Sequence, residues 1–130
     1  TSAGVIYFVD AESSALRVLR NGKVETLIGT GLFDFGHKDG KYPEAQLQHP
    51  QGLFASDQKV YVADTYNNAL RIYDVGTKTI STLTLSEGTL SEPGSVWVQR
   101  NSAYVADTNH HQIKTVDIET GKVSDFLIRN

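Results

Sequence analysis

Two stretches of the sequence, VYVADT at residues 60–65 and AYVADT at residues 103–108, are nearly identical and lie 43 residues apart. The same offset relates the segments that follow them, LRIYD at 70–74 and IKTVD at 113–117. A weaker third copy, IYFVD at residues 6–10, precedes both. A repeat of about 40 to 45 residues is typical of propeller blades, so the repetition itself predicts the fold class.

Each repeat has the pattern of short β-strands separated by turns. The apolar runs are continuous, which is typical of strands buried on both faces, and turn signals such as Asn21-Gly22 and Thr120-Gly121 punctuate the repeats. A β-sandwich has similar strand spacing, but its strands need not resemble one another at a fixed interval as stacked repeats do. The strands are predicted near 51–56, 59–64, 69–74 and 79–84, and again near 94–99, 103–107, 112–117 and 122–128.

The sequence therefore predicts an all-β chain of about three blades. The blade units are expected at about 1–28, 50–84 and 93–128, with a long inter-blade loop at 29–49. Only four residues precede the second strand of the first unit, so we expect that blade to lack its inner strand. Six blades of this length need roughly 260 residues, so a partial propeller is expected.

Composition excludes several classes of function. The 130 residues allow one domain with one modest core. A net charge of −3 offers no bulk attraction to nucleic acid or to anionic lipid, and no apolar run approaches the roughly 18 residues that cross a bilayer. The chain has no cysteine, which excludes thiolate chemistry from this segment and leaves its compartment undetermined. Because it also has no methionine, we expect a piece of a longer protein.

The motifs resemble those of NHL-repeat β-propellers. The resemblance lies in PQGL at 50–53, DTYNNALR at 64–71 and DTNHHQIK at 107–114, whereas DAESSALR at 10–17 departs more from the pattern. Segments such as GLFDFG at 31–36 are similar to those of NHL propellers that follow a thioredoxin-like domain. The resemblance implies an NHL-type propeller whose redox domain lies outside this chain, and it slightly favours the cytoplasm.

The irregular loop at 29–49 is the main candidate for a binding site. In an up-and-down blade it emerges on the same side as residues 65–68 and 108–111, and its aromatic content exceeds what a solvated loop needs. An alternative is that Leu32, Phe33 and Phe35 fold inward as a plug on the blade edge. The residues predicted to bind a partner are Phe33, Phe35, Tyr42, Tyr66, Asn67, His110 and His111.

Charged residues recur at fixed positions in the three repeats. Asp10, Asp64 and Asp107 end equivalent strands, and an Arg or Lys follows each of them by seven residues. A ring of carboxylates could hold a cation, but Asp at a strand end more often accepts backbone hydrogen bonds and shapes the next turn. We expect the cations to pair with these carboxylates, the alternative being contacts with single-stranded RNA.

Catalytic chemistry has little support in the residues. The four histidines, His37, His49, His110 and His111, lack the local spacing of a zinc site, and no Gly-x-Ser-x-Gly elbow is present. We therefore expect no cofactor, no metal and no enzymatic activity. The predicted function is an interaction scaffold that binds a protein or small ligand on its loop face. The alternatives are an RNA-binding NHL module and a metal-dependent lyase-type propeller.

Unpaired strand edges and exposed apolar blade faces also predict that the chain associates with another molecule or another part of its protein. The expected partners are another protein, the remaining blades of a propeller, or a second copy of the chain.

Overall fold

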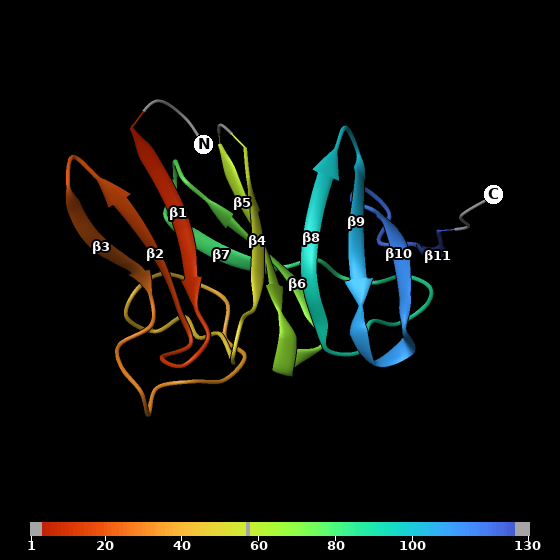
Figure 1. The fold of residues 1–130 in the computed structure, drawn as a ribbon, viewed down its shortest axis with the longest axis horizontal. Coiled ribbons are helices and arrows are strands. Elements are labelled where there is room, and N and C mark those ends of the chain that lie inside the picture. Colours follow the sequence, from red (N-terminus) through yellow and green to blue (C-terminus); the bar gives the residue numbers. More distant parts are fainter. Residues whose placement is uncertain (1–3, 57, 127–130) are drawn as a thin grey trace.

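The chain forms three antiparallel sheets that stand side by side in a computed structural model, which describes residues 4–56 and 58–126 (Figure 1). The first sheet contains β1 (Val5–Asp10), β2 (Ala15–Arg20) and β3 (Lys23–Ile28). The second contains β4 (Gly52–Ala55), β5 (Lys59–Asp64), β6 (Ala69–Asp74) and β7 (Thr79–Thr82). The third contains β8 (Pro93–Gln99), β9 (Ser102–Asp107), β10 (Gln112–Asp117) and β11 (Val123–Asp125).

Each sheet is an up-and-down meander in which consecutive strands pair. This arrangement confirms the predicted all-β partial propeller, including a first blade with three strands in the described residues. The outer ends of the predicted units 1–28 and 93–128 fall outside the described residues. The helical elements described are two short 3-10 turns, η1 (Thr65–Asn67) and η2 (Thr108–His110), neither with the length or apolar character of a membrane-spanning helix.

The hydrophobic core lies between the blades. Leu16 and Ile28 of the first blade pack with Val60, Val62 and Tyr73 of the second. The opposite side of the second blade packs in the same way on the third, through a cluster of Tyr61, Ala63, Leu70, Val105 and Val116. Among the residues that the structure describes, the second blade is therefore covered on both sides and each end blade on one.

Burial of the repeated strand follows from this position. In β5 every residue after Lys59 is buried, as the continuous apolar run predicts. In β9 buried and half-buried residues alternate, and β1 is mostly half-buried. The prediction that all three copies are buried on both faces is therefore wrong for β1 and β9, because one face of each end blade meets no other blade in the described residues.

A buried ion pair closes the second blade. The Asp64 carboxylate accepts a hydrogen bond from the Gln48 amide at 2.8 Å, one from the Asn67 side chain at 2.7 Å and one from the Arg71 guanidinium at 2.7 Å. Both charged side chains are completely buried. Burial raises the pKa of Asp64, against the opposing effect of these three donors.

Arg71 extends this cluster to the long loop. Its guanidinium donates to the backbone carbonyls of Gln46 at 2.9 Å and Lys38 at 2.8 Å, and to the Asp39 carboxylate at 3.1 Å. The loop at 29–49 is thus held from inside the blade by a side chain of β6.

The other two blades contain the same cluster in more open surroundings. In the third blade, Asp107 accepts from the Ser91 amide, from the His110 ring and from Lys114 at 2.9 Å. Although burial acts to raise the pKa of Asp107, these three partners outweigh it and leave the pKa below its ordinary value. In the first blade, Arg17 donates to Asp10 at 2.6 Å.

These contacts confirm that the recurrent aspartates accept backbone hydrogen bonds and pair with the recurrent cations. Because Arg17, Arg71 and Lys114 each bind a carboxylate, the described structure gives the RNA alternative no free triad of cations.

The two motif tyrosines should differ in their contribution to stability. Tyr61 is 9% exposed between the second and third blades, whereas Tyr104 is half-buried and contacts the edge of Phe126. Tyr104 therefore departs from the burial on both faces that its continuous apolar run predicts. Tyr61→Ala should lower the free energy of unfolding by about 3–4 kcal/mol, and Tyr104→Ala by about 1–2 kcal/mol. Urea denaturation measures both, and equal losses would contradict the two-sided packing of the second blade.

The repeated ion pair gives a second comparison. Asp64→Ala removes the counter-ion of a fully buried guanidinium, so it should lower the free energy of unfolding by about 3–5 kcal/mol. Asp10→Ala acts on the equivalent but partly exposed pair in the first blade and should cost about 1 kcal/mol or less. Urea denaturation of the two variants measures both losses of unfolding free energy. A loss at Asp10 as large as that at Asp64 would show that burial does not set the strength of the pair.

Candidate binding face

The long loop at 29–49 is hydrogen-bonded to the second blade. Gly40 exchanges backbone hydrogen bonds with Ile80 of the outer strand β7, at 2.9 and 2.8 Å. The loop also pairs with itself, since the Gln46 amide donates to the Lys38 carbonyl at 2.9 Å. Ala45 is buried with Leu47 in the core between the first two blades. Figure 1 shows the loop in orange and yellow, running past one end of these two blades.

The loop meets the turn after β5, on the side that the sequence predicts. The Tyr66 amide donates to the Gln48 carbonyl at 3.1 Å, and the rings of Tyr66 and His49 stack with centroids 4.4 Å apart. Asn67 contributes a further link by donating to the Gly36 carbonyl at 2.8 Å. These contacts place Gly36 and the last residues of the loop, Gln48 and His49, against η1.

Exposed aromatic rings gather on this part of the surface. Phe33 is 94% exposed, and Phe35 and Tyr66 are each about half exposed. A hollow of about 190 Å³ lies beside Phe35 and Tyr66 and is lined by Ala11, Glu12, Ser14, Leu32, Phe35, Gln48, His49 and Tyr66. We call the group Leu32, Phe33, Phe35, His49 and Tyr66 the aromatic face.

The alternative in which Leu32, Phe33 and Phe35 form an inward plug is wrong. The three side chains are exposed, and the loop is instead anchored by Ala45 and Leu47. The physical reason is that the backbone pairing of the loop turns these two small or branched side chains toward the core, where the aromatic rings were expected.

Tyr42 lies in a different place from the other predicted binding residues. It borders a hollow of about 280 Å³ that also contains Lys78 of the β6–β7 turn and Glu25 of β3. That turn is at the opposite end of β6 from η1. Pairing between Gly40 and Ile80 carries the loop along β7 and so separates Tyr42 from Tyr66.

Two further predicted residues belong to the ion-pair clusters. The Asn67 side chain divides its donors between Asp64 and the Gly36 carbonyl. His110 occupies the equivalent position in the third blade, on Asp107. Both side chains are therefore hydrogen-bonded within the fold, Asn67 in the second blade and His110 in the third.

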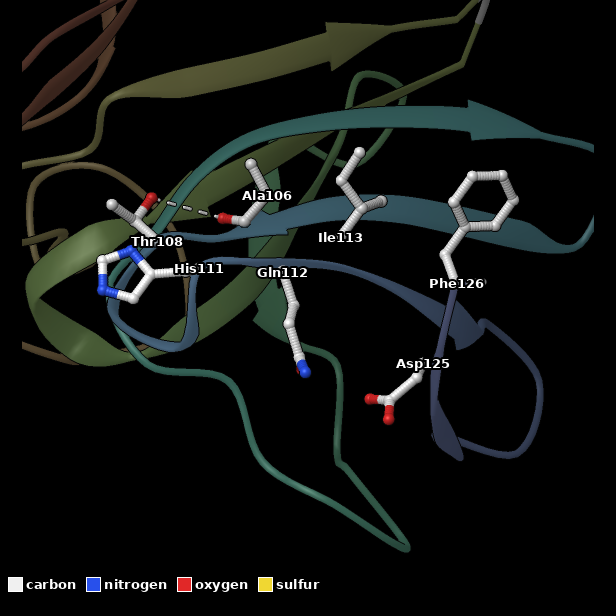
Figure 2. Close-up of a pocket in the computed structure, with 7 residues that line it drawn as sticks. All are labelled: Ala106, Thr108, His111, Gln112, Ile113, Asp125 and Phe126. Carbon is white, nitrogen blue, oxygen red and sulfur yellow. Dashed lines mark hydrogen bonds between the residues drawn. The ribbon is translucent and has the colours of Figure 1, made fainter. Parts of the chain in front are cut away.

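His111 ends η2 in the left-handed conformation, with φ at 53°, and its side chain borders a hollow of about 640 Å³ on the third blade (Figure 2). Ile113 and Phe126 line the same hollow. Neither residue is among the binding residues predicted from the sequence. A signal was available, because at the 43-residue offset they match Leu70 and Leu83, which pack in the core between the second and third blades.

No metal site is found in the residues that the structure describes. They contain no group of three or more histidine, aspartate or glutamate side chains placed to hold an ion. His37 bonds to the Thr82 hydroxyl at 2.9 Å, while His49 stacks on Tyr66.

Comparisons with known proteins bear on the family. No family model matches the chain. It is 39% identical over 115 residues to NHL repeat-containing protein 2 of Bos taurus. This match covers 72% of this chain and 16% of the relative. It is 40% identical over 86 residues to protein SUPPRESSOR OF QUENCHING 1, chloroplastic, of Arabidopsis thaliana, covering 59% and 8%. The chain therefore spans a small part of either relative.

Solved structures agree on the fold. An auxiliary nutrient binding protein from Bacteroides ovatus superposes with a TM-score of 0.75 at 13% identity, covering 95% of this chain and 35% of that chain. Similarity at this level of identity shows the fold alone. Taken with the 43-residue repeat, the three meander sheets and the similarity to NHL repeat-containing protein 2, it identifies the chain as part of an NHL-type β-propeller.

Proposed function

We propose that this chain is a non-catalytic scaffold that binds a protein partner through the aromatic face. The observation that carries the proposal is the exposure of Phe33, at 94%, on a loop that is otherwise tied down by hydrogen bonds and buried side chains. Several exposed apolar side chains together, rimmed by polar groups, are typical of an interaction surface. Aromatic anchors surrounded by polar groups are the side chains that carry most interface energy.

The size of the hollow favours a protein over a small ligand. At about 190 Å³ it is smaller than the roughly 300–1,000 Å³ typical of small-molecule pockets. It is large enough for one bulky side chain, which would insert between Phe35 and Tyr66 while the surrounding chain covers Phe33. That geometry suits an extended or looped segment of a partner protein.

The charges near the hollow indicate which charge the partner segment carries. Glu12 lines the hollow. Hydrogen bonds from the Thr30 hydroxyl and the Gln46 side-chain amide hold the pKa of Asp34 below its ordinary value, so this neighbour of Phe33 is ionised at neutral pH. We therefore expect the partner segment to place a Lys or Arg beside its apolar anchor.

The loop's support makes the face rigid before binding. Arg71 fixes the loop backbone at Lys38 and Gln46, and the His49 ring supports Tyr66. A preorganised face loses little conformational freedom on association, which favours affinity.

The proposal is tested with peptides selected from a random displayed library against the intact chain. Selected peptides should contain an aromatic or leucine anchor next to a basic residue. Phe35→Ala or Tyr66→Ala should weaken their binding by about tenfold, equivalent to about 1.4 kcal/mol, while the circular dichroism stays unchanged. Isothermal titration measures the affinity.

Matched controls lie on the opposite side of the blades, where Lys23→Ala and Lys122→Ala should leave the affinity unchanged. Peptides whose binding depends on these lysines and ignores Phe35 and Tyr66 would contradict the proposal.

A further inference from the structure

A second hollow lies between the first two blades, at the opposite end of β6 from the aromatic face. Its volume is about 280 Å³, and its walls come from β3, from the long loop, from β6 and from the turn that follows β6. This volume is close to the lower end of the roughly 300–1,000 Å³ range of small-molecule pockets, which suits a ligand no larger than a monosaccharide. We call it the rim site, and its polar lining includes Glu25, Lys41, Tyr42, Tyr73 and Lys78.

The corresponding place between the second and third blades is filled. At the 43-residue offset Lys78 matches Gly121. There the segment that follows β7 crosses the turn, and the Ser86 amide donates to the Gly121 carbonyl at 2.9 Å. A Cβ atom at residue 121 would lie 1.9 Å from the Thr84 carbonyl oxygen, so a side chain has no room there. The rim site is therefore a feature of the first two blades that the repeat does not produce in the next pair.

Tyr73 brings a hydroxyl group without a protein partner to the rim site. The residue is 3% exposed and packs in the core between the first two blades. Within the described residues its hydroxyl makes no hydrogen bond, and it is not among the fully enclosed atoms, so it opens onto the hollow that the residue lines. The third blade has Val116 at this position, so packing does not require the hydroxyl. A polar group held in a largely buried residue usually has a partner, which here a ligand would supply.

The first blade places a carboxylate beside this hydroxyl. Glu25 lies in register with Val18 and Tyr7, on the face of the first blade that packs against the second. Burial raises the pKa of Tyr73, and the Glu25 carboxylate raises it further against the opposing effect of Arg20. The phenol is therefore neutral at neutral pH, and its hydroxyl can both donate and accept a hydrogen bond.

The loop and the second blade add two cations to the same hollow. Lys41 and Lys78 are both exposed, and neither belongs to the lysines that pair with a carboxylate in the described part of the chain, which are Lys114 and Lys122. A lysine binds a carboxylate or a phosphate as a point charge. Glu25 accepts hydrogen bonds, so the three side chains together indicate a ligand that has both an anionic group and a donor.

We propose that the rim site binds a small organic anion that carries hydroxyl groups, of the size of a sugar acid or a sugar phosphate. Lys41 and Lys78 bind its carboxylate or phosphate group. The Tyr73 hydroxyl and the Glu25 carboxylate bind a ligand hydroxyl, and the Tyr42 ring, which is 52% exposed, covers a less polar side of the ligand. The rim site is separate from the aromatic face, so this ligand is additional to the proposed protein partner.

A titration followed by amide NMR of the intact chain locates the ligand. The probes are glucuronate, glucose-6-phosphate and uncharged glucose. The amides of residues 41–42 and 77–78 should shift and saturate at millimolar concentrations of at least one of the two anions, while glucose should bind at least about tenfold more weakly. The anion that binds more tightly identifies the preferred charged group, and equal affinities indicate that the shared negative charge is recognised. No saturable shift with either anion, or equal binding of glucose, would overturn the proposal.

Two substitutions test the groups that form the site. Lys78→Gly installs the residue of the third blade, which suits the φ of 58° at this position, and should weaken binding about tenfold. Tyr73→Phe removes only the hydroxyl, keeps the ring in the core and should weaken binding about threefold or more. Circular dichroism checks that both variants stay folded.

Two control variants separate this site from other surfaces. Lys122→Ala removes an exposed lysine of the third blade and should leave the affinity for the anion unchanged. Phe35→Ala, on the aromatic face, should also leave it unchanged, which distinguishes this result from the test of the proposed function. Undiminished affinity in either Lys78→Gly or Tyr73→Phe, or an equal loss in Lys122→Ala, would overturn the assignment of the site.

Discussion

The buried ion pair between Asp64 and Arg71 is the contact on which the second blade and its loop depend. The Arg71 guanidinium donates one hydrogen bond to the Asp64 carboxylate at the end of β5. It donates two more to the backbone carbonyls of Lys38 and Gln46 in the loop. Removing two charges from water is costly unless both are hydrogen-bonded. Here five of the groups around the pair supply those bonds, although the Arg71 Nε atom has no partner in the structure. One side chain therefore joins the regular blade to its irregular loop.

The repeated pair of an aspartate with an Arg or Lys lies in different surroundings in the three blades. In the middle blade the pair is sealed by the loop and by a blade on each side. In the first blade the corresponding Arg17 and Asp10 stay partly exposed, and in the third blade a histidine replaces the asparagine that contacts the aspartate. The repeated sequence therefore specifies the strands and the pairing of each aspartate with the cation seven residues later, while the neighbouring blades decide how deeply each pair is buried.

This distinction explains what could be predicted from the sequence. The repeat offset placed most strands within a few residues, because turns and apolar runs are local features. The pairing of recurrent Asp with Arg or Lys followed from their spacing. Tyr42 was grouped with Tyr66 because the pairing of Gly40 with Ile80 has no local signal. The sequence predicts Asn67 and His110 to bind a partner, but in the structure each hydrogen-bonds the aspartate three residues before it, a contact between residues that the strand pattern does not reveal.

Hydrogen exchange of the loop amides tests most directly whether Arg71 holds the loop in place. The amides of Gly36, Gln46 and Gln48 all donate hydrogen bonds in the structure. In the unaltered protein they should exchange slowly, and in Arg71→Met they should lose protection while the amides of β9 keep theirs. Loop amides that exchange at the rate of an unstructured chain in the unaltered protein, or that keep their protection in the variant, would contradict the account.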